Sequence, residues 1–398
     1  MPRLTYRLEA VPVTKGPKHH FFGYYDKLLW DEDDRYILAN EVDFMDCPPS
    51  GHDKVTIGII DTQNNFSFEP ISESSAWCWQ QGNMLQWVPN SRNLIIHNDR
   101  IGDRFVSKMI DVKTRHTRVL PRPIYTLSND GQKALSLNFS RLAVTRPGYG
   151  YNGLLDWRHD ELHPADDGIY IMDLETGDHR LIVSLDELAH IDPEESMRGV
   201  KHWFNHLLFN PTGKRFIFLH RWHAEDGRSF ITRLCTANAD GSDLFVSSLK
   251  RASHFIWYDD SHILVWGVGP EGPGYYIIED RTDKMEIMGK DVLTRDGHCT
   301  VSPDQEWILT DEYPDRDNYR TLILYKPSDN LRVDIGYFYS PPELAGEIRC
   351  DLHPRWSRSG RYVCIDSAHE GTRQMYILDV TSVIENRSNE KVKSTLKN

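Results

Sequence analysis

Four histidines occupy one position of a repeated sequence pattern, and together they could form a reactive site. Each lies three residues before an apolar residue that precedes a polar turn; they are His206, His254, His298 and His353. Imidazole is the commonest ligand of transition metals in proteins and a frequent general base. If the fold brings the four together, they predict a divalent metal site or a catalytic base. The alternative is that each imidazole only caps a turn or bonds to a neighbouring backbone group.

The histidines belong to a hairpin pattern that recurs along the whole chain. Each repeat has an apolar residue, a turn of the Ser-Pro-Asp-Gly kind and an alternating apolar strand, as in CTVSPDQEWILT at 299–310. The apolar residues, called anchors below, recur every 40 to 57 residues, apart from one interval of 82 residues. The seven anchors are Trp30, Trp87, Leu127, Phe209, Trp257, Val301 and Trp356.

A third strand follows each hairpin, for example VTIGIIDTQ at 55–63. Repeats of three or four short strands at this period predict an all-β fold, a seven-bladed β-propeller, formed as a single domain over residues 1–385. The first strand of each blade lines the central channel, so equivalent positions meet around one axis. We expect an insert at 146–167 in the third blade, a helix only near 184–197, and a polar tail at 386–398.

Composition narrows the class of partner. The formal net charge of −13 argues against a nucleic-acid or anionic-membrane binder, which would carry a basic face. The N-terminus lacks an apolar signal region, no apolar stretch reaches membrane-spanning length, and the six cysteines form no CxxC pair, so a cytoplasmic protein with reduced thiols is expected. No Walker A, GxGxxG or GxSxG motif occurs, which predicts that there is no nucleotide cofactor.

Polar side chains at the far ends of the hairpin strands form a second candidate layer. HRW at 220–222 is the most site-like, because it sets a basic pair among aromatic residues. Directly after a buried strand, such residues are either loop surface or the rim of a site.

Hairpins of the form H-x-x-(aromatic)-S-P-D-G around a histidine-lined channel resemble the propeller polysaccharide lyases, namely the oligogalacturonate lyase and ulvan-lyase-like families. The motif is found in the fourth to seventh repeats. The resemblance implies cleavage of uronate-containing oligosaccharides by β-elimination, with an acidic oligosaccharide as the partner. It also implies a divalent metal ion (manganese, zinc or calcium) on three histidines, with His206 as the base.

The ulvan-type enzymes imply a different catalytic pair, a tyrosine and an arginine from one blade. Tyr125 and Arg141 match that arrangement here. Those enzymes also place two histidines in the preceding blade, where this chain has Gln81 and His97, so that pair is incomplete. Cys299, beside His298, leaves a zinc variant open.

The candidate residues fall into three groups. The predicted catalytic residues are His206, Tyr125, Arg141 and His220. The predicted substrate-binding residues are Arg100, Arg146, Arg221, His202, Gln81, His97 and Arg355, and the predicted metal ligands are His254, His298 and His353. Chemically, removal of the proton next to a uronate carboxylate builds negative charge there, which a metal ion or an arginine would stabilise.

Other functions fit the same fold. A propeller can be a non-catalytic platform that binds a glycan or a protein. The same pocket could also belong to a metal-dependent hydrolase or to a protein of polysaccharide assembly.

Overall fold

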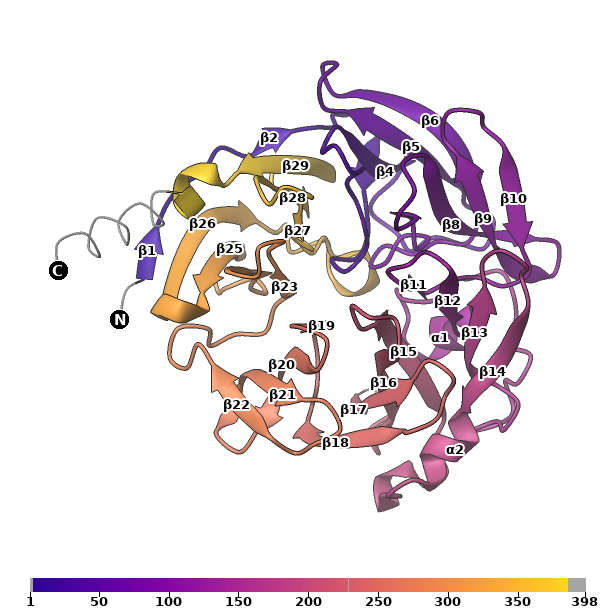
Figure 1. Cartoon of the computed structure of the whole chain (residues 1–398). Helices are drawn as coiled ribbons and strands as arrows, with labels where there is room; N and C mark the ends of the chain where they lie inside the picture. The colour runs from indigo at the N-terminus through magenta and orange to yellow at the C-terminus, as the bar shows by residue number, and fades with distance from the viewer. Residues whose placement is uncertain (1–2, 228, 386–398) are drawn as a thin grey trace.

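Short antiparallel strands, arranged as sheets around a central region, make up most of the fold (Figure 1). The computed structural model describes residues 3–227 and 229–385, so the predicted tail at 386–398 lies outside the described residues. The described α-helices are α1 (Phe139–Thr145) and α2 (Leu185–His190), and the 3-10 turns are η1 (Glu195–Met197), η2 (Pro327–Asp329) and η3 (Gly346–Ile348).

The first three sheets have four strands each, in sequence order. The first contains β3 (His19–Phe21), β4 (Tyr36–Val42), β5 (Val55–Asp61) and β6 (Ser67–Ser74). The second contains β7 (Gln86–Trp87), β8 (Leu94–Ile101), β9 (Arg104–Asp111) and β10 (Thr117–Leu120). The third contains β11 (Thr126–Leu127), β12 (Lys133–Ser136), β13 (Gly168–Asp173) and β14 (His179–Ser184).

The remaining strands form one large sheet and two smaller ones. The eight-stranded sheet contains β15 (His202–Phe209), β16 (Arg215–His223), β17 (Phe230–Asn238), β18 (Phe245–Lys250), β19 (Phe255–Trp257), β20 (His262–Gly269), β21 (Gly272–Glu279) and β22 (Met285–Met288). The next contains β23 (Thr300–Val301), β24 (Ile308–Asp311), β25 (Tyr319–Lys326), β26 (Leu331–Tyr339) and β1 (Arg3–Thr5). The last contains β27 (Arg355–Trp356), β28 (Tyr362–Ser367), β29 (Gln374–Asp379) and β2 (Val11–Pro12).

The hairpin pattern of the sequence is confirmed. Six of the seven anchors are the final residue of a short first strand, and the seventh, Trp30, forms an isolated bridge with Ile37. Side chains stabilise the turns: in the SPD turn, Ser302 Oγ accepts the Trp307 N–H at 2.9 Å. Each predicted third strand is also present, as β5, β9, β13, β17, β21, β25 and β29.

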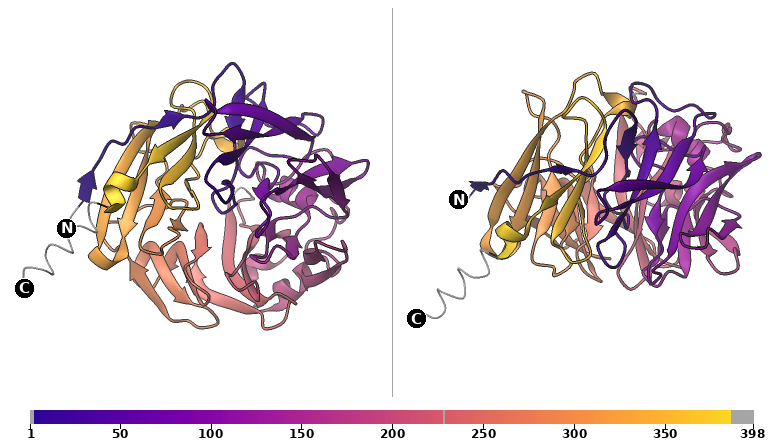
Figure 2. Two further views of the ribbon diagram at one scale, coloured as in Figure 1. Left: turned by 45° about the horizontal axis from the view of Figure 1, so that its top comes forward. Right: turned by 90° about the horizontal axis from the view of Figure 1, so that it is seen from above.

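The count of separate sheets differs from the prediction. The fourth and fifth repeats share one sheet, because β18 pairs with β20 through Lys250 and Val268. The N-terminal segment supplies an outer strand of the last sheet, because β2 pairs with β29. It reaches further, since β1 lies parallel to β26 of the preceding sheet, along the outer edge seen in Figure 2.

The helices differ from the single helix expected from the sequence. Arg141, a predicted catalytic residue, lies on a helix, because β12 ends at Ser136 and α1 begins at Phe139. Asn138 explains where this helix begins, because its side-chain oxygen accepts the Arg141 N–H and caps the helix. The helix expected near 184–197 is present only as α2 and η1.

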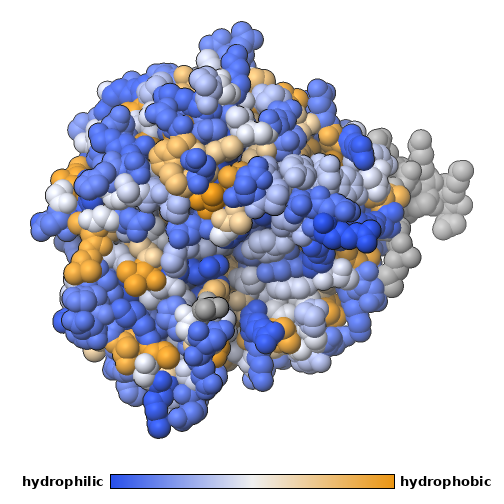
Figure 3. All heavy atoms as spheres, turned by 180° about the vertical axis from the view of Figure 1, so that it is seen from behind, coloured by the Kyte–Doolittle hydropathy of each residue, from blue (hydrophilic) through white to orange (hydrophobic). Residues whose placement is uncertain are grey.

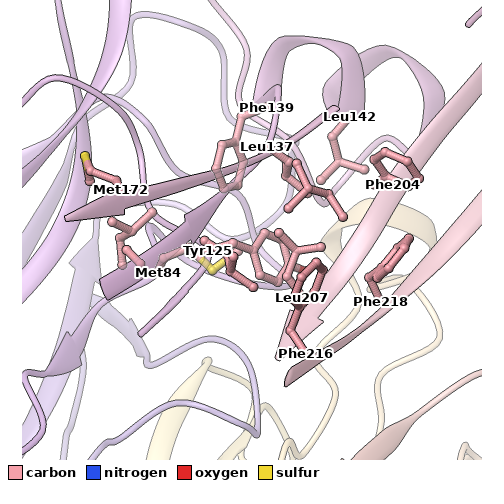
Figure 4. Packing of buried hydrophobic residues seen from close by; sticks show 14 of the residues in the cluster. Met84, Tyr125, Leu137, Phe139, Leu142, Met172, Phe204, Leu207, Phe216 and Phe218 are labelled. Atoms are coloured by element: carbon pink, nitrogen blue, oxygen red, sulfur yellow. The ribbon is translucent and has the colours of Figure 1, made fainter. Parts of the chain in front are cut away.

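The largest apolar core cluster lies where the third sheet, α1 and β15–β16 meet. Phe139 and Leu142 of α1 pack with Leu207 of β15 and Phe218 of β16 (Figure 4). Tyr125, one of the predicted catalytic residues, lies within this cluster. On the face that lies behind the view of Figure 1, hydrophilic side chains predominate (Figure 3).

Among residues 3–227 and 229–385, none of the helices has the length and apolar character needed to cross a membrane.

The buried ion pair between Arg141 and Asp156 allows a test of how the insert is held in the fold. Both side chains are buried, and Arg141 Nη1 lies 3.1 Å from Asp156 Oδ2. Asp156→Ala leaves an uncompensated buried guanidinium, so we expect a loss of about 3–5 kcal/mol in the free energy of unfolding, measured by urea denaturation. The exposed neighbour provides the control, since Asp160→Ala should cost at most about 1 kcal/mol. Equal losses for the two variants would contradict the assignment.

Candidate functional site

The fold gathers the four histidines of the repeat. The ring centres of His254 and His298 lie 4.1 Å apart, and those of His298 and His353 lie 4.4 Å apart. His206 is joined to them through Tyr24, whose ring stacks on His206 at 4.9 Å and meets His353 edge-on at 5.0 Å. The histidines therefore form one cluster with a tyrosine between its members.

The backbone at the repeated position aims these side chains. His206 and His353 have φ values of 55° and 41°, and Met84, which is equivalent in the second repeat, has 58°. Non-glycine residues seldom adopt this left-handed region, and they persist there when the surrounding structure fixes them. The ladder between β15 and β16 shifts register between Asn205 and Leu208, so His206 lies in a β-bulge. Bulges of this kind redirect a side chain out of the sheet.

Tyr24 and Tyr25 were not identified from the sequence. They follow β3, and Gly23 lets the chain pass close to Gln81: at its φ of 127°, an added Cβ would lie 2.9 Å from the Gln81 carbonyl. The Tyr25 hydroxyl donates to the Phe255 carbonyl at 2.8 Å and accepts the Phe255 N–H at 3.0 Å. The N-terminal segment is thus hydrogen-bonded to β19 inside the ring. The only sequence signal was the GYYDK run before the first anchor.

His298 is oriented by a carboxylate. Asp311, at the end of β24, accepts from both the His298 backbone N–H at 2.7 Å and its Nδ1 at 2.9 Å. Gly297 permits this contact, because a Cβ there would collide with the Asp311 carbonyl oxygen. The other ring nitrogen of His298, Nε2, is buried and has no hydrogen-bond partner in the described structure. A carboxylate–histidine arrangement of this kind is typical of metal ligands.

His298, Asp351 and His353 offer ligand atoms within 4.8 Å of one another, and all three are buried. The Nε2 of His353 is also buried without a hydrogen-bond partner in the described residues. Two imidazoles and one carboxylate suit a divalent transition metal. The residues present therefore fit such an ion.

Asp351 is held in its charged form. Burial alone would raise the pKa of its carboxyl, but Arg349 and Arg320 hold that pKa well below its usual range. Arg349 Nε donates to Asp351 Oδ2 at 2.7 Å, and Arg320 Nη2 lies 2.6 Å from Oδ1. The sequence analysis missed Asp351, although it stands two residues before His353.

His254, the third predicted ligand, is not part of this group. It lies beside His298 and its Nδ1 is 2.9 Å from Asp296 Oδ1. Cys299, considered for a zinc site, is buried outside the group as well. The structure thus combines two of the three predicted histidines with a carboxylate.

A cavity of about 560 Å³ opens beside the histidine cluster. His206, His254 and Asp296 line it, with Tyr149 of the insert and Tyr313. Of the predicted substrate-binding residues, Arg146 and Arg221 line it too.

The two arginines form a cationic wall. Both guanidinium groups lie over the Phe230 ring, at 4.8 Å for Arg146 and 4.7 Å for Arg221. Among the described residues neither forms an ion pair with a carboxylate, and Arg221 Nε donates only to Thr232 Oγ1. Burial, and then Arg146, lower the pKa of Arg221 to about 10. Uncompensated guanidinium groups of this kind favour an anionic ligand.

His206 is a neutral imidazole on the cavity wall. Burial lowers its pKa well below the ordinary value, and Arg221 and His254 add to the effect. Its Nδ1 lies 3.2 Å from Gln81 Nε2 and 3.3 Å from the Tyr125 hydroxyl. The Tyr125 hydroxyl also accepts the His206 backbone N–H at 3.1 Å. Gln81 and Tyr125 therefore hold the imidazole in place from behind.

The Tyr125–Arg141 pair of the ulvan-type enzymes is not formed. Tyr125 is buried beneath His206, and burial raises its pKa well above the ordinary value, so the phenol stays protonated. Arg141 Nε donates to the His202 carbonyl and its Nη1 to Asp156, which fixes the insert. These hydrogen bonds indicate that Arg141 has a structural role and does not bind substrate.

Five other predicted site residues do not line this cavity, because they satisfy buried or local contacts elsewhere. Two of the five, His202 and His220, bond to each other at 2.9 Å, and His220 also bonds to Arg233 at 3.0 Å. The others are His97 with Asn98 and Ser72, Arg355 with Asp366, and Arg100 with the Gly153 carbonyl.

No protein-family model matches the sequence, and no curated protein matches it either. Among solved structures, the chain is similar to an oligogalacturonate lyase from Vibrio parahaemolyticus, with 13% identity, a TM-score of 0.66 and coverage of 94% of each chain. A structure of oligogalacturonate lyase in complex with manganese gives the same identity and TM-score, with 94% of this chain and 95% of that chain covered. The β-propeller domain of the Trilobed protease from Pyrococcus furiosus has 12% identity and a TM-score of 0.51, with 90% of this chain and 96% of that chain covered. At these identities the likeness is one of fold, and that fold is propeller-like.

The metal group can be tested by thermal stability. Excess Mn²⁺ should stabilise the protein by about 2.7 kcal/mol at 100 times its Kd, seen as a rise in Tm. His298→Ala should abolish the rise, and Asp311→Asn should weaken Mn²⁺ binding by about 10- to 100-fold. The exposed His116→Ala is the control and should behave as the unaltered protein does. An undiminished Mn²⁺ response in His298→Ala would exclude the site.

Proposed function

We propose that this protein is a metal-dependent lyase that cleaves uronate-containing oligosaccharides by β-elimination. One observation carries the proposal: a buried group of two histidines and a carboxylate lies close to a cavity lined by two unpaired arginines and a neutral histidine. The fold likeness to oligogalacturonate lyases, one of them with manganese, supports it.

We infer an acidic sugar as the substrate, because arginines line the cavity although the chain as a whole is negatively charged. The chain carries −13, yet the cavity wall offers Arg146 and Arg221 without acidic partners. These guanidinium groups would bind a uronate carboxylate and orient the sugar ring. A divalent ion held by His298, Asp351 and His353 would add positive charge for the carboxylate as its negative charge grows.

In the elimination, neutral His206 would take the proton from the carbon next to the carboxylate at Nε2. This requires the ring's own proton on Nδ1, donated to the Gln81 side-chain oxygen with the amide in its flipped orientation. The electrons of that C–H bond form a carbon–carbon double bond, and the glycosidic C–O bond on the neighbouring carbon breaks. Tyr149 would protonate the departing oxygen. Its hydroxyl accepts from Arg349 Nη2 at 2.6 Å, which leaves its own proton directed elsewhere. Arg221 would stabilise the transition state more than the ground state, because negative charge accumulates on the substrate carboxylate during the reaction.

We further propose that the fold is a seven-bladed propeller formed as one domain over 1–385. The eight-stranded sheet consists of two runs of four strands, β15–β18 and β19–β22, linked by the single pair Lys250–Val268. Counting each run as a blade gives seven units, six of four strands and one of five, in which β1 is the additional strand. β2, on the last sheet, would join the two ends of the chain.

The lyase activity has a direct assay. Incubation with uronate oligosaccharides and Mn²⁺ should produce an unsaturated product, followed by its ultraviolet absorbance. His206→Ala should lower kcat by about 10²- to 10⁴-fold, while His116→Ala leaves it unchanged. Cleavage without the absorbance would indicate a hydrolase, and binding without cleavage would indicate a platform; either result contradicts the proposal.

The lowered pKa of His206 sets the pH dependence. A base stays unprotonated above its pKa, so His206 should remain active as the pH falls through 6.5, the ordinary value for histidine. In a kcat profile from about pH 8 to about pH 5, the acid-side midpoint should lie below 6.5. A midpoint above 6.5 would rule out His206 as the base.

A further inference from the structure

The insert presents two exposed apolar side chains on either side of a buried acid. Leu155 is 74% exposed and Trp157 is 54% exposed, whereas Asp156 between them is buried. Large apolar side chains gathered at a surface commonly mark a binding site. Here the question is what holds them there and what would cover them.

The insert is held rigidly by the Arg141 guanidinium. Its Nη1 pairs with Asp156, and its Nη2 donates to the carbonyls of Leu162 at 2.6 Å and Glu161 at 2.9 Å. Asn138 Nδ2 donates to the other Asp156 oxygen at 2.9 Å. Because the backbone is fixed by these buried bonds, Leu155 and Trp157 are presented in a preformed arrangement, which lowers the entropic cost of binding.

A second cavity, of about 420 Å³, lies beside these side chains. Phe105 and Phe139 contribute apolar lining, and Arg104 and Arg122 contribute cations. It shares no lining residue with the cavity at the histidine cluster. The two are therefore separate sites.

Arg122 interacts electrostatically with Asp167 and with the Tyr170 hydroxyl. No ion pair joins it to a carboxylate in the part of the chain that the structure describes, and its Nε is buried without a hydrogen bond. Its guanidinium lies over the Tyr170 ring at 3.4 Å, which fixes its orientation. Arg104 contacts only the exposed Asp103, at 3.7 Å.

The charge around the cavity is mixed. Residues 104–122 carry six lysines and arginines against one aspartate, whereas Asp103 also lines the cavity and the insert around Trp157 carries Asp160, Glu161 and Asp166.

The Arg158 guanidinium lies 4.5 Å from the centre of the Trp157 ring, so a ligand has only the remaining exposed surface of the indole. A sugar ring that bears an acid would stack on that surface while its carboxylate pairs with Arg122.

We propose that the Leu155–Trp157 surface and its cavity form a second, non-catalytic binding site for an acidic polysaccharide. A sugar ring stacks on Trp157 and its carboxylate pairs with Arg122. The choice of an acidic sugar rests on the proposed function. The site would hold a long chain while another part of it occupies the catalytic cavity.

The test is electrophoresis of the full-length protein through gels that contain polygalacturonate, with EDTA present so that no metal-dependent cleavage occurs. The unaltered protein should be retarded by polygalacturonate and not by neutral dextran. Trp157→Ala and Arg122→Gln should each weaken binding by about tenfold. The controls are Tyr319→Ala, an exposed aromatic residue on β25, and Arg316→Gln, an exposed arginine, which should bind as the unaltered protein does.

Each other outcome overturns the proposal. Absent retardation, equal retardation by dextran, or undiminished binding by Trp157→Ala would do so. A dimer on size-exclusion chromatography that dissociates in Trp157→Ala would instead assign this surface to contact between copies.

The outcome is independent of the lyase assay. Retardation that depends on Trp157 without any unsaturated product would leave this site standing and remove the lyase. An unsaturated product with unchanged retardation in Trp157→Ala would do the reverse. If both hold, Trp157→Ala should raise KM for long chains and leave the rate on a diuronide unchanged.

Discussion

The hydrogen bonds between Tyr25 and the backbone of Phe255 connect the N-terminal segment to a strand that lies 230 residues further along the chain. They fix the tyrosine pair in the middle of the histidine cluster, where Tyr24 contacts His206, His298 and His353. Without this packing the four imidazoles would surround an open space, and His206 would lose its link to the metal-binding side. The contact between His206 and the other histidines through Tyr24 depends on this anchoring.

Charge in the centre is balanced locally. Asp351 is surrounded by Arg320 and Arg349, and His298 is paired with Asp311, so the candidate metal group sits among compensated charges. On the wall of the cavity, Arg146 and Arg221 form no ion pair with a carboxylate among the described residues. Buried charges are costly unless they are paired, so an uncompensated pair is maintained at the expense of stability. Function at this wall explains that cost better than packing does.

Local sequence patterns were sufficient to predict the hairpins, because anchor, turn and strand are neighbours in the chain. They also predicted that four histidines would meet, since equivalent repeat positions face one axis. They did not predict Asp351, whose backbone conformation and ion pairs come from tertiary contacts. Nor did they separate His206 and Arg221, which line the cavity, from His220 and His97, which serve buried hydrogen bonds. Residue type is the same in both cases, and only the partners differ.

The two ends of the chain meet at the last sheet: β2 pairs with β29, and the Phe22 N–H donates to Asp366. Two of the three candidate metal ligands, Asp351 and His353, come from the part of the chain that precedes this last sheet. During synthesis the ribosome releases the N-terminal tyrosines long before these neighbours emerge. The candidate metal group can therefore form only after the chain has been synthesised through His353.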